Sequence, residues 1–209
     1  MIADTVDNPK KIKVVTIEDI NRRTENPSLF IEECEEKYRR RIARATAGIK
    51  ENLSSKPIIL LSGPSGSGKT TSANLIARAL NDDGINTIVI SMDDYFVPGV
   101  IPPGPDGKVD YERPDRVDIP LLKRDMEILA EGGEITLPVF NFSDNSRSWG
   151  ETIKRDKDTA VIIEGIHALN PELTGTHHDY ATFVYVSVRT RIADNTGQLL
   201  HPSKIRLLR

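Results

Sequence analysis

Cysteine is almost absent from this sequence: Cys34 is the single one in 209 residues, so the chain cannot form a disulfide within itself. The 4 histidines are scattered and have no cysteine partner at the spacing of a zinc site, which excludes a zinc finger or ribbon. Because a chain without disulfides suits a reducing compartment, we expect the protein to be cytoplasmic.

Long apolar runs and an excess of positive charge are also missing. No run approaches the roughly 20 residues that cross a membrane, and the first residues lack the basic and apolar regions of a secretory signal. Lysine and arginine number 28 against 31 aspartates and glutamates, which gives a net charge of −3. We therefore expect no membrane partner and no surface built to bind nucleic acid.

The order of apolar patterns predicts an α/β fold with a central, mostly parallel sheet. Apolar residues recur every three or four positions along residues 31–49, which predicts a long helix starting at Pro27. The residues before it are expected to be irregular, apart from a strand-like run at 12–15. Further on, short apolar runs typical of buried parallel strands alternate with helical patterns; the runs are 58–61, 87–90, 159–163 and 182–188. This pattern favours an N-terminal extension over residues 1–55 and a main domain over 56–209.

A glycine-rich motif follows the first buried run. Residues 63–70 read Gly-Pro-Ser-Gly-Ser-Gly-Lys-Thr and fit G-x-x-x-x-G-K-[ST] at every fixed position, between a strand and a helix. Backbone N–H groups and the helix N-terminus at such a turn can hold the phosphates of ATP, whereas an ordinary glycine turn needs no such pattern. We expect Lys69 to reach the β and γ phosphates and the Thr70 hydroxyl to bind Mg²⁺. The predicted ATP-binding residues are Gly63, Ser65, Gly66, Ser67, Gly68, Lys69, Thr70 and Thr71.

Two carboxylates follow predicted strands, at the sheet edge where α/β proteins bind ligands. Asp93 can accept a proton from an attacking hydroxyl or hold a magnesium-bound water, and Glu164 can help to position the metal. Acidic residues after strands also serve as helix caps or turn formers, but next to the glycine loop the pair favours chemistry. We predict Asp93, Lys69 and Glu164 as catalytic, and Thr70, Asp93 and Glu164 as magnesium ligands.

Several motifs follow one another in an order that resembles one family. They are the glycine loop, Ser91-Met92-Asp93-Asp94-Tyr95-Phe96, Tyr111-Glu112-Arg113-Pro114-Asp115, Pro138-Val139-Phe140-Asn141-Phe142 and Val161-Ile162-Ile163-Glu164-Gly165-Ile166. From about Pro57 onward the chain resembles the uridine kinase and phosphoribulokinase family. The resemblance implies a three-layer P-loop NTPase fold of the nucleoside-monophosphate-kinase type, with Asp93 as the base for the acceptor hydroxyl. It also implies that Tyr111 stacks on the acceptor and that Glu112 binds its ribose hydroxyls.

The acceptor side departs from that family in two places. Where uridine kinases usually read Tyr-Asp-Phe and then a histidine, this chain reads Phe140-Asn141-Phe142 without the histidine, which weakens recognition of the base by hydrogen bonds. Residues 203–209 resemble the start of the arginine-bearing lid, most of which the chain lacks. The predicted acceptor-binding residues are Tyr95, Tyr111, Glu112, Arg113, Phe140, Phe142 and Arg147; Trp149 and His167 we interpret as structural.

These observations predict an ATP- and Mg²⁺-dependent kinase that phosphorylates a hydroxyl of a small molecule, with a nucleoside as the first choice. A sugar phosphate or pantothenate is the alternative acceptor, since Arg113, Arg116 and Arg147 could bind an anionic group. A second alternative is a non-catalytic, ATP-binding regulatory module. The sequence leaves the oligomeric state open, with a homo-oligomer among the outcomes.

Overall fold

The structure, a computed structural model, describes residues 13–99, 103, 107, 110–174, 179–187 and 190–201. The chain divides into two compact units, which are Met1–Arg40 with Ser187–Arg209, and Arg41–Val186. The larger unit carries the glycine-rich motif. The predicted start of a lid at residues 203–209 lies outside the described residues.

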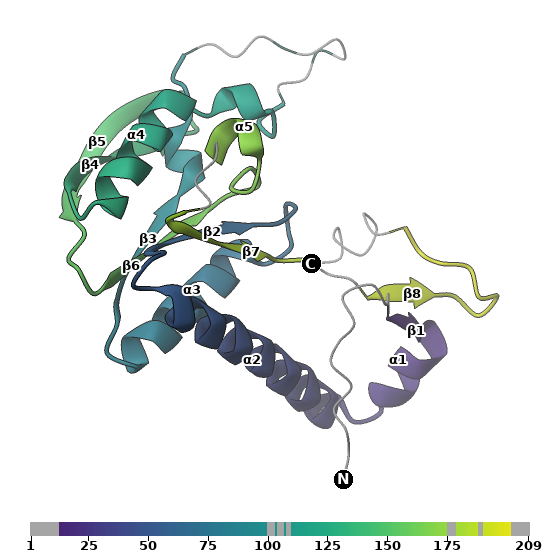
Figure 1. Ribbon diagram of the computed structural model, residues 1–209. Helices are drawn as coiled ribbons and strands as arrows, with labels where there is room; N and C mark the ends of the chain where they lie inside the picture. Colours follow the sequence, from purple (N-terminus) through teal and green to yellow (C-terminus); the bar gives the residue numbers. More distant parts are fainter. Residues whose placement is uncertain are drawn as a thin grey trace. The chain divides into compact units, whose positions relative to one another are not determined.

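Four parallel strands form the sheet of the larger unit, in the order β3-β6-β2-β7 (Figure 1). They are β2 (Ile58–Ser62), β3 (Asn86–Ser91), β6 (Thr159–Glu164) and β7 (Ala181–Tyr185). The two central strands, β2 and β6, are buried along their whole length, which explains why their sequences are continuous apolar runs. The predicted parallel α/β sheet is confirmed.

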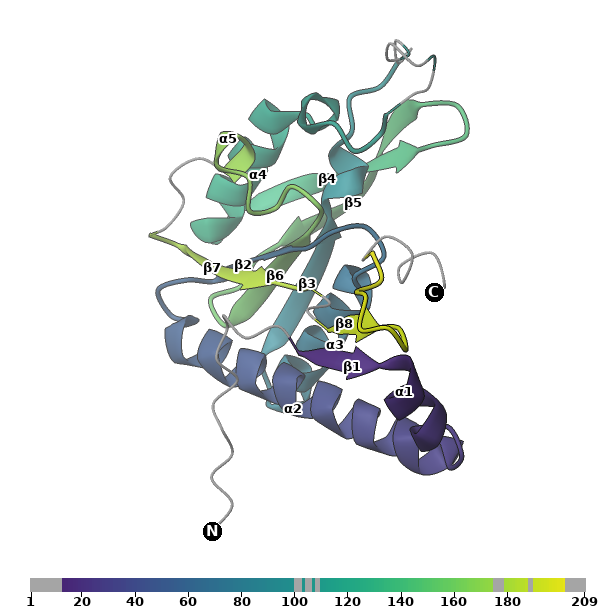
Figure 2. The ribbon, with the colours of Figure 1, turned by 90° about the vertical axis from the view of Figure 1, so that its right-hand side faces the viewer.

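Helices cover both faces of this sheet and make the three layers. They are α3 (Lys69–Asp82), α4 (Ile119–Ala130), the short α5 (Pro171–Thr174) and the last turns of α2 (Pro27–Asn52). Because successive strand residues point to opposite faces, Ile59 and Leu61 pack with α3, whereas Ile58 and Leu60 pack with α4. Figure 2 shows α3 and α4 on opposite sides of the strands.

A β-hairpin follows α4. Strand β4 (Glu134–Asn141) pairs antiparallel with β5 (Ser146–Lys154), and Asn145 at the turn has a φ of 52°. The sequence predicts an extended segment over residues 135–140 but not its partner. Almost all of β5 is exposed, so this strand has no apolar alternation that would identify it.

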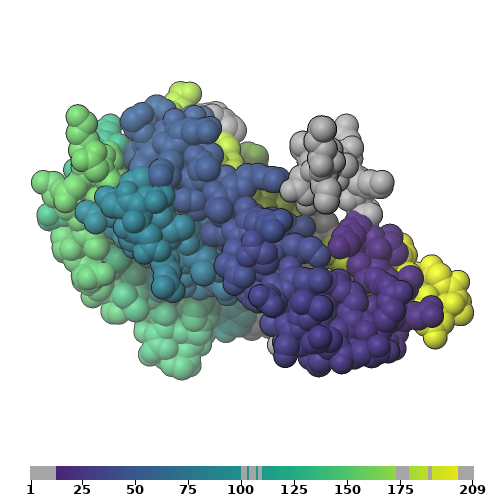
Figure 3. Space-filling model, turned by 90° about the horizontal axis from the view of Figure 1, so that it is seen from below, coloured from purple at the N-terminus to yellow at the C-terminus, as the bar shows by residue number. Residues whose placement is uncertain are grey.

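The smaller unit contains two short strands that come from distant parts of the chain. Strand β1 (Val14–Thr16) pairs in parallel with β8 (Arg191–Ala193), and Figure 3 shows the purple atoms of the first segment beside the yellow atoms of the second. Helix α1 (Ile17–Arg23) follows β1, so the expectation of an irregular segment before Pro27 is wrong there. The hydroxyl of Thr16 accepts a hydrogen bond from the backbone N–H of Asp19 at 3.0 Å and caps this helix, which is too short to show a periodic pattern.

Local residues set the limits of other helices. Helix α2 begins at Pro27, as the sequence predicts. The Asp118 carboxylate caps α4 by accepting the backbone N–H of Leu121 at 3.1 Å. Gly84, with a φ of 81°, ends α3. Within the described residues, no helix has both the length and the apolar character to span a bilayer.

Arg155, directly after β5, closes the C-terminal end of α4. Its guanidinium group donates to the carbonyl oxygens of Leu129 and, at 3.0 Å, Ala130. It also donates to the Thr159 carbonyl oxygen at 3.4 Å. The residue is 9% exposed, and burial lowers the pKa of the guanidinium group. This side chain therefore supplies charged donors to carbonyl groups in and beside the last turn of a helix, where donors from the helix itself run out.

Replacing Arg155 by methionine should lower the free energy of unfolding by about 3 kcal/mol, because buried carbonyl groups lose a charged donor. Urea unfolding of Arg155→Met measures the change. Lys154→Met is the matched control at the exposed neighbouring position and should stay within about 0.5 kcal/mol of the unsubstituted chain. Equal stability of the two variants would contradict this account of Arg155.

Candidate active site

The phosphate-loop motif, residues 63–70, lies between the end of β2 and the start of α3, as the sequence predicts. Gly66 and Gly68 have φ values of 69° and 88°, in the region that favours glycine. Gly68 is the N-cap residue of α3 and has no side chain to cap the helix. The N–H groups of the first turn of α3 are therefore available to phosphate oxygens.

Gly63 allows the close approach on which the start of this loop depends. A Cβ atom at this position would lie 2.2 Å from the carbonyl oxygen of Val186, which follows β7. The neighbouring Val186 N–H donates to the carbonyl oxygen of Ser62 at 2.7 Å, so the two segments are held together. Only glycine fits between them without a backbone shift.

Thr70 and Glu164 meet at the phosphate end of the site. The Thr70 hydroxyl donates to Glu164 Oε1 at 2.8 Å, and Glu164 is 7% exposed. Lys69 is the residue before Thr70, and its Nζ lies 3.4 Å from the carbonyl oxygen of Pro64. The first turn of α3 and the end of β6 thus place a cation, a hydroxyl and a carboxylate together.

The oxygen groups at this end fit Mg²⁺. This ion prefers hydroxyl and carboxylate oxygens and usually keeps several waters and substrate phosphates as further ligands. Within the described residues, no three Asp, Glu, His or Cys side chains form a complete metal cage. A hydroxyl and one or two carboxylates beside a phosphate loop are the donor set that this kind of shared site needs.

Asp93 lies on a short 3-10 helix, η1 (Met92–Tyr95), directly after β3. The Ser91 hydroxyl accepts the backbone N–H of Asp93 at 3.2 Å and fixes the start of this helix. Although the residue is exposed, protein atoms around its carboxyl group keep water from it and raise its pKa. The neighbouring Lys69 opposes this shift, as does His167 to a smaller extent.

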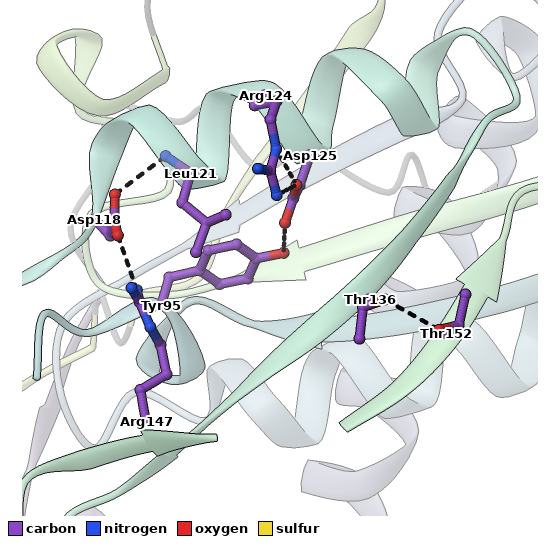
Figure 4. Close-up of polar contacts among 8 residues, drawn as sticks. All are labelled: Tyr95, Asp118, Leu121, Arg124, Asp125, Thr136, Arg147 and Thr152. Carbon is purple, nitrogen blue, oxygen red and sulfur yellow. Dashed lines mark hydrogen bonds and ion pairs between the residues drawn. The ribbon is translucent and has the colours of Figure 1, made fainter. Parts of the chain in front are cut away.

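A buried hydrogen bond to α4 holds η1 in place, as Figure 4 shows. The Tyr95 hydroxyl donates to Asp125 Oδ2 at 3.2 Å, and Asp125, on α4, is 1% exposed and also accepts from Arg124 at 2.8 Å. Burial and the nearby Asp125 carboxylate raise the pKa of Tyr95. The adjacent Asp94 accepts the backbone N–H of Phe140, on β4, at 3.3 Å. Asp93 therefore lies on a segment that is attached to both α4 and the hairpin.

A cavity of about 180 Å³ joins these groups to residues of the predicted acceptor side. Its lining residues are Ser65, Lys69, Thr70, Asp93, Phe96, Tyr111, Glu112, Phe142, Glu164, Gly165 and Ile166. The predicted catalytic residues Lys69, Asp93 and Glu164 thus line one cavity, although their roles stay predictions.

Aromatic rings form one wall of this cavity. The Phe142 ring lies 5.4 Å from Phe96, 4.9 Å from Phe140 and 6.0 Å from Tyr111, in edge-to-face arrangements that aromatic pairs prefer. Phe140 is buried behind the wall, whereas Phe142 is 48% exposed. The sequence did not identify Phe96 as a site residue.

Four predicted acceptor-binding residues do not line the cavity, and one of them is Phe140, behind the aromatic wall. Tyr95 is buried against Asp125, as described above. Arg113 pairs with Asp115, and Arg147 Nη1 lies 2.8 Å from Asp118 Oδ2, as Figure 4 shows for the second pair. The cation that the lining contains is Lys69, at the phosphate end.

This fold and this loop define the class: an α/β protein with a P-loop nucleotide site. The chain belongs to the phosphoribulokinase/uridine kinase family, whose model matches residues 58–194, roughly two thirds of its length.

Relatives of known name agree with the family assignment. The chain is 36% identical to a uridine kinase of Lactobacillus helveticus over 116 residues, which cover 54% of each protein. It is 33% identical to a uridine kinase of Lactobacillus johnsonii over 121 residues, which cover 57% of this chain and 56% of the relative. The chain thus spans about half the length of the curated relatives that it matches. In fold it is similar to the solved structure of a possible uridine kinase from Bacillus stearothermophilus, with 22% identity, a TM-score of 0.58 and coverage of 73% of this chain and 82% of that one.

Gly63→Ala should lower the free energy of unfolding by roughly 3 kcal/mol and weaken ATP binding, because the new Cβ forces the loop away from Val186. Urea unfolding and calorimetric titration with ATP measure the two effects. Gly48→Ala is the matched control: it lies in α2, a Cβ there meets nothing within 4 Å, and alanine should raise the stability by up to about 1 kcal/mol. A Gly63→Ala variant with normal stability and affinity would refute the steric argument.

Asp93→Asn should make the folded chain more stable near neutral pH. The pKa of Asp93 in the folded state lies above its ordinary value of 3.8. The folded state therefore loses stability as the pH rises from the ordinary pKa through the folded-state pKa. The asparagine variant escapes this loss, and its advantage should disappear below the ordinary pKa, where Asp93 is protonated in both states. Urea unfolding between pH 3.5 and 7.5 tests the trend, with Asp156→Asn, at an exposed loop position, as control. A constant difference across this range would show that the Asp93 pKa is not raised.

Proposed function

We propose that this protein is an ATP- and Mg²⁺-dependent kinase that transfers the γ-phosphoryl group of ATP to a hydroxyl of a nucleoside. The observation that carries the proposal is the single cavity lined by Lys69, Asp93 and Glu164 at one end and by Tyr111, Glu112 and Phe142 at the other. Phosphoryl transfer needs positioning and charge neutralisation rather than covalent chemistry by the protein. These side chains are of the types that supply both.

At the phosphate end, the N–H groups of the loop and of the first turn of α3 would bind the triphosphate, with Lys69 at the β and γ phosphates. Thr70, Glu164 and Asp93 are the residues that would hold Mg²⁺. When bound, the ion neutralises charge on the phosphates. The hydrogen bond between Thr70 and Glu164 keeps two of these oxygen groups together before ligands arrive.

Asp93 is the proposed base for the acceptor hydroxyl. Its raised pKa makes the carboxylate a better proton acceptor than an ordinary aspartate. Its backbone is fixed through Ser91 on one side and through the buried Tyr95 on the other. The base is thereby held at one end of the cavity, close to the phosphate loop.

The acceptor end favours a neutral molecule with a flat ring. Tyr111, Phe96 and Phe142 offer ring surfaces, and the Glu112 carboxylate can accept hydrogen bonds from ribose hydroxyls. A sugar phosphate or pantothenate carries negative charge, which Glu112 would repel. Because two of the three candidate arginines, Arg113 and Arg147, are paired with aspartates, the contacts of these two favour the nucleoside over the anionic alternatives.

The test is ADP release with Mg·ATP across a panel of uridine, cytidine, adenosine, ribulose 5-phosphate and pantothenate. A nucleoside should stimulate ADP release, and Asp93→Asn should lower that rate by about 1,000-fold while ATP still binds, because the proton acceptor is lost. Asp156→Asn serves as the control and should leave the rate unchanged. ATP binding without acceptor-dependent ADP release would favour the regulatory module, and stimulation by an anionic acceptor alone would overturn the nucleoside.

A further inference from the structure

The turn that follows β6 is attached to the phosphate side of the site. The Gly165 N–H donates to the carbonyl oxygen of Leu61 at 3.1 Å, and the Ser62 hydroxyl donates to the carbonyl oxygen of Ile166 at 2.8 Å. Leu61 and Ser62 are the last two residues of β2, directly before the phosphate loop. The position of this turn is therefore fixed relative to the residues that would bind ATP.

The same turn also contacts the segment that carries Asp93. A Cβ atom on Gly165 would lie 2.7 Å from both Cβ and Sδ of Met92, the first residue of η1. Within the turn, the Ala168 N–H donates to Gly165 O at 3.2 Å, and the Asn170 N–H donates to His167 O at 2.8 Å. His167 thus projects from a backbone that is held by β2, by η1 and by its own turn.

His167 connects this turn to the acceptor side. Its Nε2 lies 2.6 Å from the backbone carbonyl oxygen of Glu112, which is 55 residues earlier in the chain. Because a carbonyl oxygen can only accept, Nε2 carries the proton and donates. Glu112 lines the cavity, so this hydrogen bond holds the backbone of a residue on the proposed acceptor side.

The other hydrogen bonds that the described structure gives for residues 110–115, the Glu112 segment, are local. The Glu112 N–H donates to Asp110 Oδ1 at 2.9 Å, and Arg113 pairs with Asp115. Local bonds shape the segment but do not set its distance from the phosphate loop. The contact to His167 joins the segment to the turn after β6, which is attached to the end of β2 directly before the phosphate loop.

We propose that His167 is a positioning residue, which holds Glu112 at the correct distance from Asp93 and the phosphate loop. The proposal rests on the proposed kinase function. In-line transfer requires the acceptor oxygen within about 3.5 Å of the phosphorus, and a misplacement of about 1 Å can cost two orders of magnitude in rate. Glu112 can position the acceptor only if the backbone of Glu112 is itself held in position.

Two substitutions separate positioning from a merely structural role. His167→Ala removes the donor, whereas His167→Gln keeps an N–H donor, because the glutamine Nε2 is the same number of bonds from the backbone as the histidine Nε2. His201→Ala replaces a described histidine of the other compact unit and is the control. Circular dichroism and urea unfolding show whether each variant is folded.

His167→Ala should raise the KM for the nucleoside at least tenfold and leave the KM for ATP within about twofold. His167→Gln should restore the nucleoside KM to within about threefold of the unsubstituted protein, and His201→Ala should change neither constant. Calorimetric titration of the nucleoside in the presence of ADP gives the same comparison without turnover, with weaker binding expected for His167→Ala alone.

The outcomes distinguish this inference from the function on which it rests. If the unsubstituted protein shows no nucleoside-dependent ADP release, the proposed function fails. If that protein is active and His167→Ala keeps its nucleoside KM, the positioning role is wrong. An equal rise of both KM values, or a glutamine variant as impaired as the alanine variant, would also overturn it, because neither follows from the loss of one acceptor-side hydrogen bond.

Discussion

The in-register pairing of three parallel strands is the constraint on which the rest of the site depends. Glu164, the last residue of β6, lies opposite Leu61 of β2 and opposite Ser91 of β3. The chain leaves all three strands at this one edge, so the phosphate loop, η1 and the turn after β6 begin side by side. The proximity of Lys69, Asp93 and Glu164 therefore follows from the sheet, and side-chain contacts only refine it.

The acceptor side depends on a different element, helix α4. Asp118 caps this helix with one carboxylate oxygen and pairs with Arg147 of β5 through the other, and Asp125 accepts the Tyr95 hydroxyl of η1. Helix α4 packs on the sheet through Leu122 and other buried residues. The hairpin and η1 are therefore both attached to a helix whose position the sheet fixes. The aromatic wall and the proposed base are thus held by an ion pair and a hydrogen bond to two aspartates of one helix.

This difference explains which features could be predicted from the sequence. The phosphate loop, Asp93 and Glu164 follow apolar runs within three residues, so strand prediction and a local motif were enough to place them. Choosing between the adjacent Tyr95 and Phe96 requires knowing that Asp125, thirty residues later, buries the tyrosine. Neither the partner of His167 nor the strand β5 could be predicted, because the first is a non-local contact and the second lacks apolar alternation.

The pairing of the hairpin arginine joins stability to the choice of acceptor. The side chain of Arg147 is 17% exposed and that of Asp118 is 24% exposed. The pair is thus partly removed from water, and each charge needs the other as a partner. An Arg147 that turned to bind an anionic acceptor would leave Asp118 without its partner and loosen β5 from α4. The attraction for an anion would then have to exceed the loss of this contact and also the repulsion from Glu112. The same ion pair that supports the aromatic wall is therefore an argument for the uncharged acceptor that we propose.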